Sequence, residues 1–260
     1  KIFKKFKIFF FKPIRKITES MKNVLIIGAS SDCGKHIAKK IASKNFNLIL
    51  ASRDQNKLIE IKNDILKKNK VRCQVLNFDI CNHDFNSFFQ QLEYKPDVLI
   101  STIGINQEKK IFDQNEFYNV INTNYVKLVL FIENILQKYH HSDQYLSIIV
   151  FSSIAGERGR SYNYIYGSSK SALTQYLSGL RQKYNSSNIN IITMIPGYIK
   201  TKMLKNKNTN IFLTTSTNKI ADIVYNAYTK KKDVVYTPFW FFISALIKII
   251  PEFIYKKLKF

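Results

Sequence analysis

A serine, a tyrosine and a lysine with chemically useful spacing lie in the middle of the chain. Ser153 follows an apolar run that ends at Ser152, and Tyr166 and Lys170 come later with the spacing Tyr-x-x-x-Lys. Residues at i and i+4 share one face of a helix, so the ammonium would lie beside the phenol and should lower its pKa. A tyrosine tuned in this way can exchange a proton with a carbonyl oxygen that the serine hydroxyl holds. This chemistry suits carbonyl reduction, provided that a hydride donor is near.

Two other tyrosines lie close to Tyr166 and are distinguished from it by the same spacing. Tyr162 and Tyr164 are followed four residues later by Tyr166 and Ser168, so only Tyr166 has a cation at that position. A single Tyr-x-x-x-Lys is more often the aromatic start of a helix with a solvated lysine. The role of Tyr166 therefore depends on what the rest of the chain places beside it.

The bulk composition fits one α/β domain, or two small ones, with a substantial core. The chain has 260 residues, of which 45% are hydrophobic. Its three cysteines are an odd number without metal-site spacing, which indicates a reducing compartment and a cytoplasmic protein. The four histidines form no ligand cluster, so we expect no metal.

The chain is strongly basic, with a formal net charge of +23. Such an excess attracts nucleic acids or anionic membranes. No nucleic-acid-binding signature is present, and the densest charge lies at the two ends, where lysine alternates with Phe, Ile and Trp. We therefore expect a peripheral position at the inner face of the membrane, and no nucleic acid partner. The lysine bias of an AT-rich genome is the plain alternative.

Residues 1–21 form a basic N-terminal extension ahead of the first strand. On a helical wheel its lysines and arginines lie opposite five apolar side chains, Phe3, Phe6, Phe10, Ile14 and Ile17. Pro13 should kink this helix, and its apolar run is too short to span a bilayer. An interfacial helix is expected if residues 1–20 belong to the protein, whereas Met21 is an alternative native start.

The first convincing strand, 23–27, leads into a glycine-containing turn and then a helix at about 35–44. A dinucleotide-binding turn requires this order, because glycines let the backbone approach a pyrophosphate at a helix N-terminus. The turn residues expected to meet the cofactor are Gly28, Ser30, Ser31, Asp32, Cys33 and Gly34.

The end of the second strand, 47–51, indicates which dinucleotide is bound. An acidic residue at this position would hold a ribose 2′-hydroxyl. Here Ser52 and Arg53 come first. A hydroxyl and a guanidinium suit a 2′-phosphate better, so we expect NADP(H) in preference to NAD(H). Asp54 keeps open the alternative that Arg53 is an ordinary surface residue of the loop.

Strand-like and helix-like stretches alternate along most of the chain. Strands are expected at 23–27, 47–51, 72–78, 97–101, 146–152, 190–195 and 234–236, and helices at about 35–44, 58–68, 84–92, 115–138 and 163–184. This alternation predicts an α/β fold, a Rossmann-type doubly wound parallel sheet of about seven strands with helices on both faces. Ligands bind at the carboxyl ends of such strands, where several polar or glycine residues lie: Gly28, Arg53, Asp79, Gly104, Ser153 and Pro196.

From about residue 22 to residue 236 the chain resembles the short-chain dehydrogenase/reductase family. The matching features, in order, are the glycine turn, Asp79, Gly104, Asn124, Ser153, Tyr166-x-x-x-Lys170 and Pro196-Gly197-x-x-x-Thr201. The resemblance implies that Tyr166 protonates the substrate carbonyl. It also implies that Lys170 lowers the pKa of Tyr166 and bonds the nicotinamide ribose, while Ser153 orients the carbonyl.

The resemblance assigns the remaining site residues as well. Asn124, favoured over Asn122, would hold a water of the proton relay. Asp79 and Ile80 would meet the adenine. The carboxamide would be held by Thr201 and the backbone near Ile199, just after Pro196 and Gly197. Without the family, Asp79 is as readily a strand-end turn, and Thr201 a helix cap.

Two positions depart from the family pattern. Asp32 stands where the middle glycine of the turn is usual, and Ser101-Thr102-Ile103-Gly104 stands where Asn-Asn-Ala-Gly is usual. A carboxylate beside a pyrophosphate should repel it, unless Asp32 caps the helix and points away. An acidic residue here is also similar to one branch of the family, the reductases of decaprenylphosphoryl-2-keto-pentose, which act with a flavin oxidase.

Residues 237–260 follow the last strand and combine aromatic and basic side chains. The apolar run from Pro238 to Pro251 is too short to span a bilayer. An interfacial anchor, a cap over the substrate cleft and a dimer contact are the alternatives, with the anchor slightly favoured. Residues 202–217 are expected to form the substrate loop.

Together these observations predict an NADPH-dependent short-chain reductase acting on a ketone of a lipid-linked or other hydrophobic molecule. A polyprenyl-phosphate-linked keto-sugar is the specific candidate, and a 3-oxoacyl or 3-keto-lipid reductase is the alternative enzyme. A membrane-associated, cofactor-binding protein without catalysis is the alternative of another class, which Asp32 favours. The resemblance further implies a homo-oligomer, and the branch implies a partner oxidase.

Overall fold

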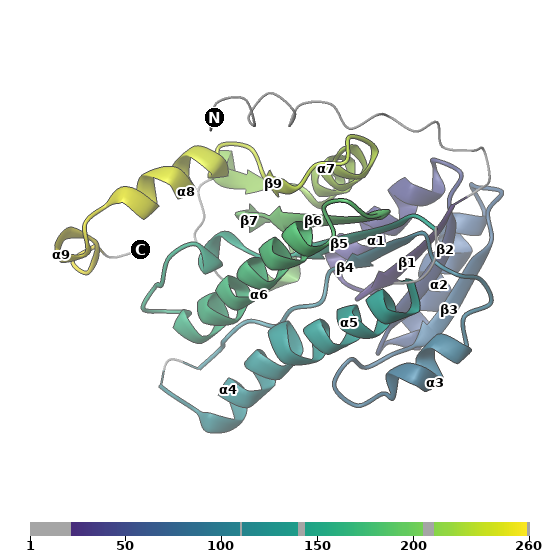
Figure 1. Cartoon of the computed structure of the whole chain (residues 1–260), viewed down its shortest axis with the longest axis horizontal. Coiled ribbons are helices and arrows are strands. Elements are labelled where there is room, and N and C mark those ends of the chain that lie inside the picture. The colour runs from purple at the N-terminus through teal and green to yellow at the C-terminus, as the bar shows by residue number, and fades with distance from the viewer. Residues whose placement is uncertain (1–21, 110, 140–143, 205–210, 259–260) are drawn as a thin grey trace.

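A seven-stranded sheet forms the centre of the molecule (Figure 1). The structure, a computed structural model, describes residues 22–109, 111–139, 144–204 and 211–258, so the predicted extension at 1–21 lies outside the described residues. All neighbouring strands of the main sheet are parallel. In spatial order they are β3 (Cys73–Asn77), β2 (Asn47–Ser52), β1 (Asn23–Ile27), β4 (Val98–Ser101), β5 (Leu146–Phe151), β6 (Ile189–Ile195) and β9 (Val234–Tyr236).

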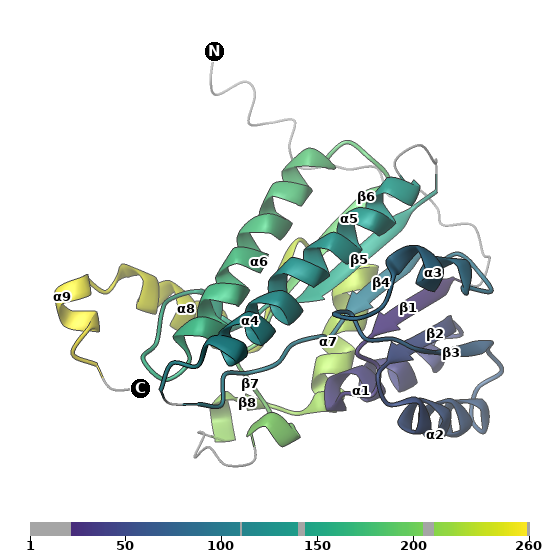
Figure 2. The ribbon, with the colours of Figure 1, turned by 90° about the horizontal axis from the view of Figure 1, so that it is seen from below.

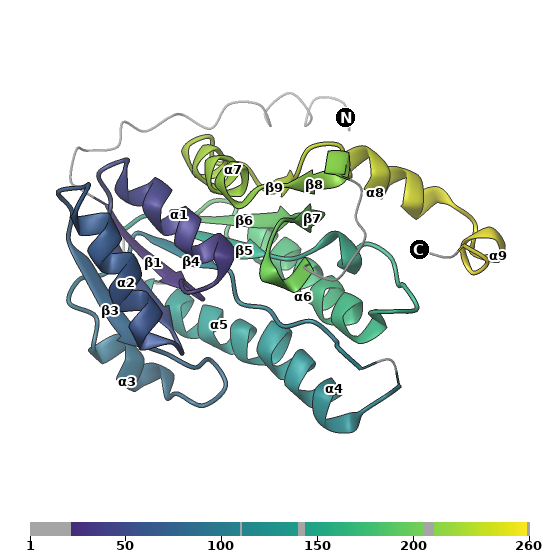
Figure 3. The same ribbon diagram turned by 180° about the vertical axis from the view of Figure 1, so that it is seen from behind.

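Helices cover both faces of the sheet, which confirms the doubly wound α/β prediction (Figures 1 and 3). One face carries α1 (Asp32–Ala42), α2 (Gln55–Leu66) and α7 (Thr217–Thr229); the other carries α3 (Phe85–Gln90), α5 (Lys127–Tyr139) and α6 (Tyr164–Lys183). The strands are apolar on both sides because both sides are covered. In β1, Val24 and Ile26 join the first core, and Leu25 and Ile27 join the second.

Strand order reverses beside β1, and this reversal locates a crevice. The chain runs outward from β1 to β2 and β3, then returns to place β4 on the other side of β1. The βα loops after β1 and β4 therefore leave the sheet in opposite directions. Doubly wound sheets bind ligands in the crevice that opens between such loops.

Two helices differ from the sequence prediction for local reasons. Helix α1 begins at Asp32, three residues before the predicted start, because Ser31 caps it by accepting the Gly34 amide at 3.0 Å. The predicted helix at 115–138 is a composite of α4 (Gln114–Ile121), a π-helical turn at Asn122–Val126 and α5. π-Helical turns are rare in proteins overall, and those that occur are often found at functional sites.

The chain after β6 holds elements that the sequence did not predict. Strands β7 (Tyr198–Ile199) and β8 (Thr214–Thr215) form a small parallel pair at the two ends of the predicted substrate loop. Helix α7 follows and packs against α1. Beyond β9, helices α8 (Trp240–Ile249) and α9 (Glu252–Tyr255) extend away from the body of the molecule (Figure 2). Within the described ranges, no helix has the length and apolarity needed to cross a bilayer.

Candidate active site

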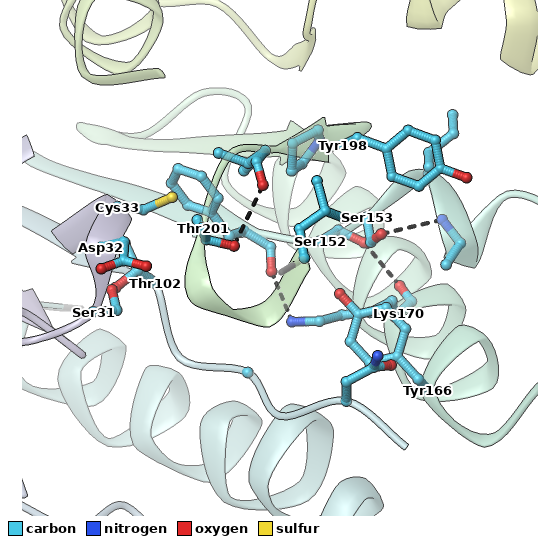
Figure 4. Close-up of a pocket in the computed structure, with 18 of the residues that line it drawn as sticks. Ser31, Asp32, Cys33, Thr102, Ser152, Ser153, Tyr166, Lys170, Tyr198 and Thr201 are labelled. Carbon is cyan, nitrogen blue, oxygen red and sulfur yellow. Dashed lines mark hydrogen bonds between the residues drawn. The ribbon is translucent and has the colours of Figure 1, made fainter. Parts of the chain in front are cut away.

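Ser153, Tyr166 and Lys170 line one cavity of about 420 Å³ at the carboxyl ends of the strands. Ser153 follows β5 and caps a short 3₁₀ turn, where its hydroxyl accepts the Ala155 amide at 3.1 Å. Tyr166 and Lys170 lie one turn apart on α6. Figure 4 shows these three residues on one side of the cavity, and Ser31, Asp32 and Thr102 of the glycine-turn region on the other.

The phenol of Tyr166 is hydrogen-bonded to the Ser153 side chain. Burial raises the pKa of Tyr166, and the bond from Ser153 only partly opposes this effect. The predicted lowering of this pKa by Lys170 is therefore wrong for the protein without its cofactor. The physical reason is geometric, because the ammonium of Lys170 bonds to backbone carbonyls and lies 5.9 Å from the centre of the Tyr166 ring.

Lys170 is buried and held from two sides. Its ammonium donates to the Phe151 carbonyl at 2.9 Å and approaches the Ile103 carbonyl at 3.4 Å. Gly104 makes this approach possible, since a Cβ there would lie 3.1 Å from Lys170 Nζ. Burial lowers the pKa of Lys170 to about 8. The charge of this lysine is thus poised to change in the physiological range.

Asn124 lies fully buried in the π-helical turn and organises the loop after β4. Its amide group accepts the Ile105 N–H at 2.8 Å and donates to the Ile105 carbonyl at 2.9 Å. It also donates to the Ser169 hydroxyl on α6 at 3.1 Å. Asn124 therefore connects the loop to the helix that carries Tyr166, which supports choosing it over Asn122. Its predicted role in holding a relay water stays a prediction.

The glycine turn has the close packing that a dinucleotide-binding turn needs. Gly28 has a φ of +79°, which favours glycine, and a Cβ there would lie 2.8 Å from Thr102 Oγ1. At Gly34 a Cβ would lie 2.5 Å from the Gly28 carbonyl oxygen. Thr102 donates to the Gly28 carbonyl at 2.9 Å and shares a hydrogen bond with Ser31 at 3.0 Å. Thr102 was not predicted as a site residue, and it completes this turn.

Asp32 lies in the first turn of α1 and lines the cavity. Its carboxylate accepts the Lys202 backbone N–H at 2.8 Å, across the cavity from α1. The suggestion that Asp32 caps the helix is wrong, because Ser31 is the cap. The carboxylate still gains from the positive end of the helix dipole. Cys33 beside it has its pKa raised by burial to about 12, so its thiol stays protonated.

The two residues predicted to select NADP(H), Ser52 and Arg53, differ in exposure. Ser52 is buried at the end of β2, and its hydroxyl has no hydrogen-bond partner among the described residues. Arg53 is exposed after the strand. Lys57, which the sequence reasoning missed, lines the cavity and pairs with the Asp54 carboxylate. Lys57 therefore lines the cavity, whereas Arg53 does not.

Asp79 and Ile80, predicted to meet the adenine, do not line the cavity. The Asp79 carboxylate accepts the Cys81 amide at 3.0 Å and the Asn82 side chain at 2.9 Å. These bonds form the strand-end turn that was the alternative interpretation. Ile80 is buried in the core with Phe78. A role for either residue at the adenine stays a prediction.

The segment after β6 forms the wall beside Ser153. The Pro196 carbonyl accepts the Ile154 amide at 3.0 Å, which ties this wall to the serine loop. Gly197 is needed because Trp240 of α8 fills the space of a side chain, and a Cβ would lie 1.9 Å from its ring. Ile199 and Thr201 line the cavity, as do three residues that sequence reasoning missed, Arg160, Tyr162 and Tyr198.

The arrangement matches one family of enzymes over most of the chain. The family model described as short chain dehydrogenase matches residues 22–211. The chain belongs to the short-chain dehydrogenase family. As a member, it is an NAD(P)-dependent oxidoreductase with a Rossmann-like fold.

The chain is also similar to oxidoreductases from several organisms. The chain is 29% identical over 234 residues to an NADP-dependent 3-hydroxy acid dehydrogenase of Schizosaccharomyces pombe, covering 82% of this chain and 89% of that protein. It is 27% identical over 195 residues to the 3-oxoacyl-[acyl-carrier-protein] reductase FabG of Buchnera aphidicola, covering 72% and 77%. Among solved structures, a short-chain dehydrogenase from Sphingobium yanoikuyae in complex with NADPH is similar, with a TM-score of 0.77, 19% identity and coverage of 89% and 97%. At that identity the last likeness concerns the fold alone.

Proposed function

We propose that this protein is an NADPH-dependent reductase that converts a ketone to an alcohol. One observation supports this proposal above the others: Ser153, Tyr166 and Lys170 open into the same cavity as the glycine turn. The turn offers backbone and hydroxyl groups at the N-terminus of α1, where a pyrophosphate binds favourably. The residues present therefore fit a nicotinamide dinucleotide, which supplies the hydride when it is bound.

The chain's own residues supply the proton and hold the carbonyl. The Ser153 hydroxyl, already bonded to the Tyr166 phenol, is placed to orient the substrate oxygen. Tyr166 has a raised pKa and is protonated at neutral pH, so it can donate its proton to that oxygen as the carbonyl carbon is reduced. Lys170 on the same helix face does not lower this pKa in the protein without its cofactor; in the cofactor complex its ammonium would favour the phenolate that results. Asn124 holds the loop after β4 against α6 through its hydrogen bonds to Ile105 and Ser169.

The preference for NADPH is part of the proposal. Lys57 lines the cavity and Arg53 is exposed directly after β2, outside the cavity lining; a guanidinium together with an ammonium would favour a 2′-phosphate. The name of the Schizosaccharomyces pombe relative also specifies NADP. The negative charge of Asp32 opposes binding of the pyrophosphate. Its carboxylate, however, is hydrogen-bonded to the Lys202 backbone N–H and lies at the positive end of the α1 dipole, which offsets part of that charge.

An exposed apolar face on the C-terminal helices supports a substrate that lies in, or at, a lipid surface. Six large side chains with more than half of their surface exposed follow one another on α8, α9 and the turn before them: Phe239, Phe241, Phe242, Leu246, Ile249 and Phe253. We call these residues the C-terminal apolar face. Exposed apolar side chains gathered on one segment in this way are typical of interaction sites. Lys256 and Lys257, close after it, match an anionic membrane.

This face is attached to the catalytic loop. Glu157, four residues after Ser153, has a buried side chain that accepts the Ser244 hydroxyl at 2.6 Å and also pairs with Lys248. Arg158 donates to the carboxylate of Glu252 at 2.8 Å and stacks on the Tyr255 ring at 3.8 Å. A membrane bound by α8 and α9 would therefore lie beside the substrate end of the cavity.

Two substrate classes are proposed. The first is a ketone on a polyprenyl-phosphate-linked sugar, as in the branch with an acidic residue at the position of Asp32; a partner oxidase belongs to this proposal. The second is a 3-oxoacyl chain, which the name of the Buchnera aphidicola relative favours. A homo-oligomer is compatible with either.

The test is oxidation of NADPH with each ketone presented in detergent micelles, followed by identification of the alcohol. Reduction of the keto-sugar or of the 3-oxoacyl thioester supports the proposal and selects the substrate class. Tight NADPH binding without reduction of any ketone would contradict it in favour of a cofactor-binding protein without catalysis. Tyr164→Phe serves as the matched control for Tyr166→Phe, because Tyr164 is exposed on the same helix.

A further inference from the structure

Arg160 is a buried cation at the substrate end of the cavity that the mechanism above does not use. It lies in the loop between Ser153 and Tyr166, lines the same cavity and is only 8% exposed. Its guanidinium donates to the Tyr162 hydroxyl at 3.2 Å. It is also hydrogen-bonded to the phenol of Tyr198, which enters from β7. Two segments far apart in the sequence thus meet at this arginine.

The chemistry of this cluster is that of an oxyanion receptor. Burying a guanidinium is costly unless charged or hydrogen-bonding groups compensate. The two phenols that Arg160 contacts accept from its guanidinium and are also hydrogen-bonded to each other. Burial raises the pKa of Tyr198, so that its O–H is kept at neutral pH. A planar guanidinium that two phenols hold in place at the cavity wall suits phosphate and carboxylate oxygens.

Arg158, two residues earlier, shows what a structural arginine looks like in the same loop. Its guanidinium faces away from the cavity and is satisfied by the Ile247 and Ile250 carbonyls and the Glu252 carboxylate. Arg160 faces the cavity instead. The loop therefore holds one arginine that anchors α8 and α9 and one that is presented to the substrate.

We propose that Arg160, with Tyr162 and Tyr198, is a subsite for an anionic oxygen group on the substrate, either a phosphate or a carboxylate. The cluster would fix the charged part of the molecule while its ketone lies between Ser153 and Tyr166. As a statement about substrate class the inference rests on the proposed function, whereas the binding of an anion at Arg160 does not.

The experiment is a calorimetric titration of the full chain with three probes that share one alkyl chain: octyl phosphate, octanoate and octanol. It is run with and without saturating NADPH, which fills the other phosphate-binding end of the cavity. We expect at least one anion to bind about 10- to 100-fold more tightly than octanol, as a charge-assisted bidentate pair contributes. The favoured anion, phosphate or carboxylate, identifies the group that the substrate carries.

Three variants distinguish a ligand-binding role of Arg160 from a purely structural one. Arg160→Gln should abolish the advantage of the anion over octanol, and Arg160→Lys should restore part of it because the charge returns. Arg72→Gln removes the same charge from the surface, where Arg72 stacks on Tyr94, and should leave the advantage intact. Melting curves recorded by circular dichroism verify that each variant is folded.

The proposal is overturned if wild-type protein binds octanol as tightly as both anions, which requires no variant to establish. It is also overturned if the anion advantage survives in folded Arg160→Gln, or disappears equally in Arg72→Gln. Because these titrations measure binding without turnover, a protein that reduces no ketone but binds octyl phosphate through Arg160 would contradict the proposed function while supporting the subsite.

Discussion

The two ends of the cavity are built in different ways. The cofactor end is built around one short segment in which neighbours in sequence are neighbours in space, the turn from Gly28 to Gly34, which Thr102 from the loop after β4 completes. The substrate end brings together Arg160, Tyr198 and Trp240 from three distant segments. The turn at the cofactor end is thus specified mainly by residues close together in the sequence. The substrate end depends on packing between distant segments, which can vary without moving Ser153, Tyr166 and Lys170.

The largest effect is expected at the acid shared by both ends. Tyr166→Phe removes the proton donor and should lower kcat for ketone reduction by about 10³-fold, while NADPH binding changes little. Steady-state kinetics and a parallel fluorescence titration measure the two quantities. Tyr164→Phe should stay close to wild type. A Tyr166→Phe variant with an undiminished rate would show that the proton comes from elsewhere.

We expect the protein to bind membranes through the C-terminal apolar face, which lies beside the substrate end of the cavity. The triple change Phe242→Glu, Leu246→Glu and Ile249→Glu replaces three exposed apolar side chains, each contributing about 1.5–3 kcal/mol when buried, and should weaken vesicle binding about 100-fold or more. Flotation with vesicles containing about one-third anionic lipid measures it.

The matched control for this change is Ile59→Glu with Leu66→Glu, which replaces exposed apolar residues of α2 at 42% and 41% exposure. It should float as wild type does. Binding should also weaken as salt increases, because the lysines contribute through screened charge. Equal flotation of the triple variant and wild type would exclude this face as the membrane contact.

The pH dependence of reduction should report Lys170. Its pKa is lowered to about 8, so the ammonium is present below this pH and is lost as the pH rises through it. Because the proposed role of the protonated lysine is to favour the Tyr166 phenolate in the cofactor complex, kcat/KM should fall above about pH 8 by roughly tenfold per pH unit. Lys170→Arg keeps its charge and should move this fall to higher pH. A profile that is flat up to about pH 10 would contradict the assignment.

A smaller effect, on NADPH affinity, is expected at Asp32, which stands where the family usually has glycine. Asp32→Asn removes a negative charge near the expected pyrophosphate but keeps an oxygen that can accept the Lys202 amide. NADPH should bind roughly 3- to 10-fold more tightly, consistent with one screened charge of about 1 kcal/mol. Asp64→Asn, which breaks an outer-surface pair with Lys39, is the control. Weaker binding in Asp32→Asn would show that the carboxylate assists the cofactor.

The same contrast explains how much the sequence could predict. All seven strands of the main sheet were predicted, because apolar runs between helical patterns are local signals, and Ser153, Tyr166 and Lys170 followed from their spacing. The pKa of Tyr166 was predicted wrongly, since spacing cannot show that the Lys170 ammonium bonds to the Phe151 carbonyl. Arg160 and Tyr198 were missed because only the folded chain brings them together.

The most direct test is a titration of the purified protein with NADPH and with NADH, followed by nicotinamide fluorescence, with Arg53→Ala beside wild type. Tight NADPH binding, weak NADH binding and loss of that preference in the variant are the expected results, because the proposed role of the guanidinium is to pair with the 2′-phosphate. Binding of neither nucleotide would contradict the assignment of this cavity to an NADPH-dependent reductase.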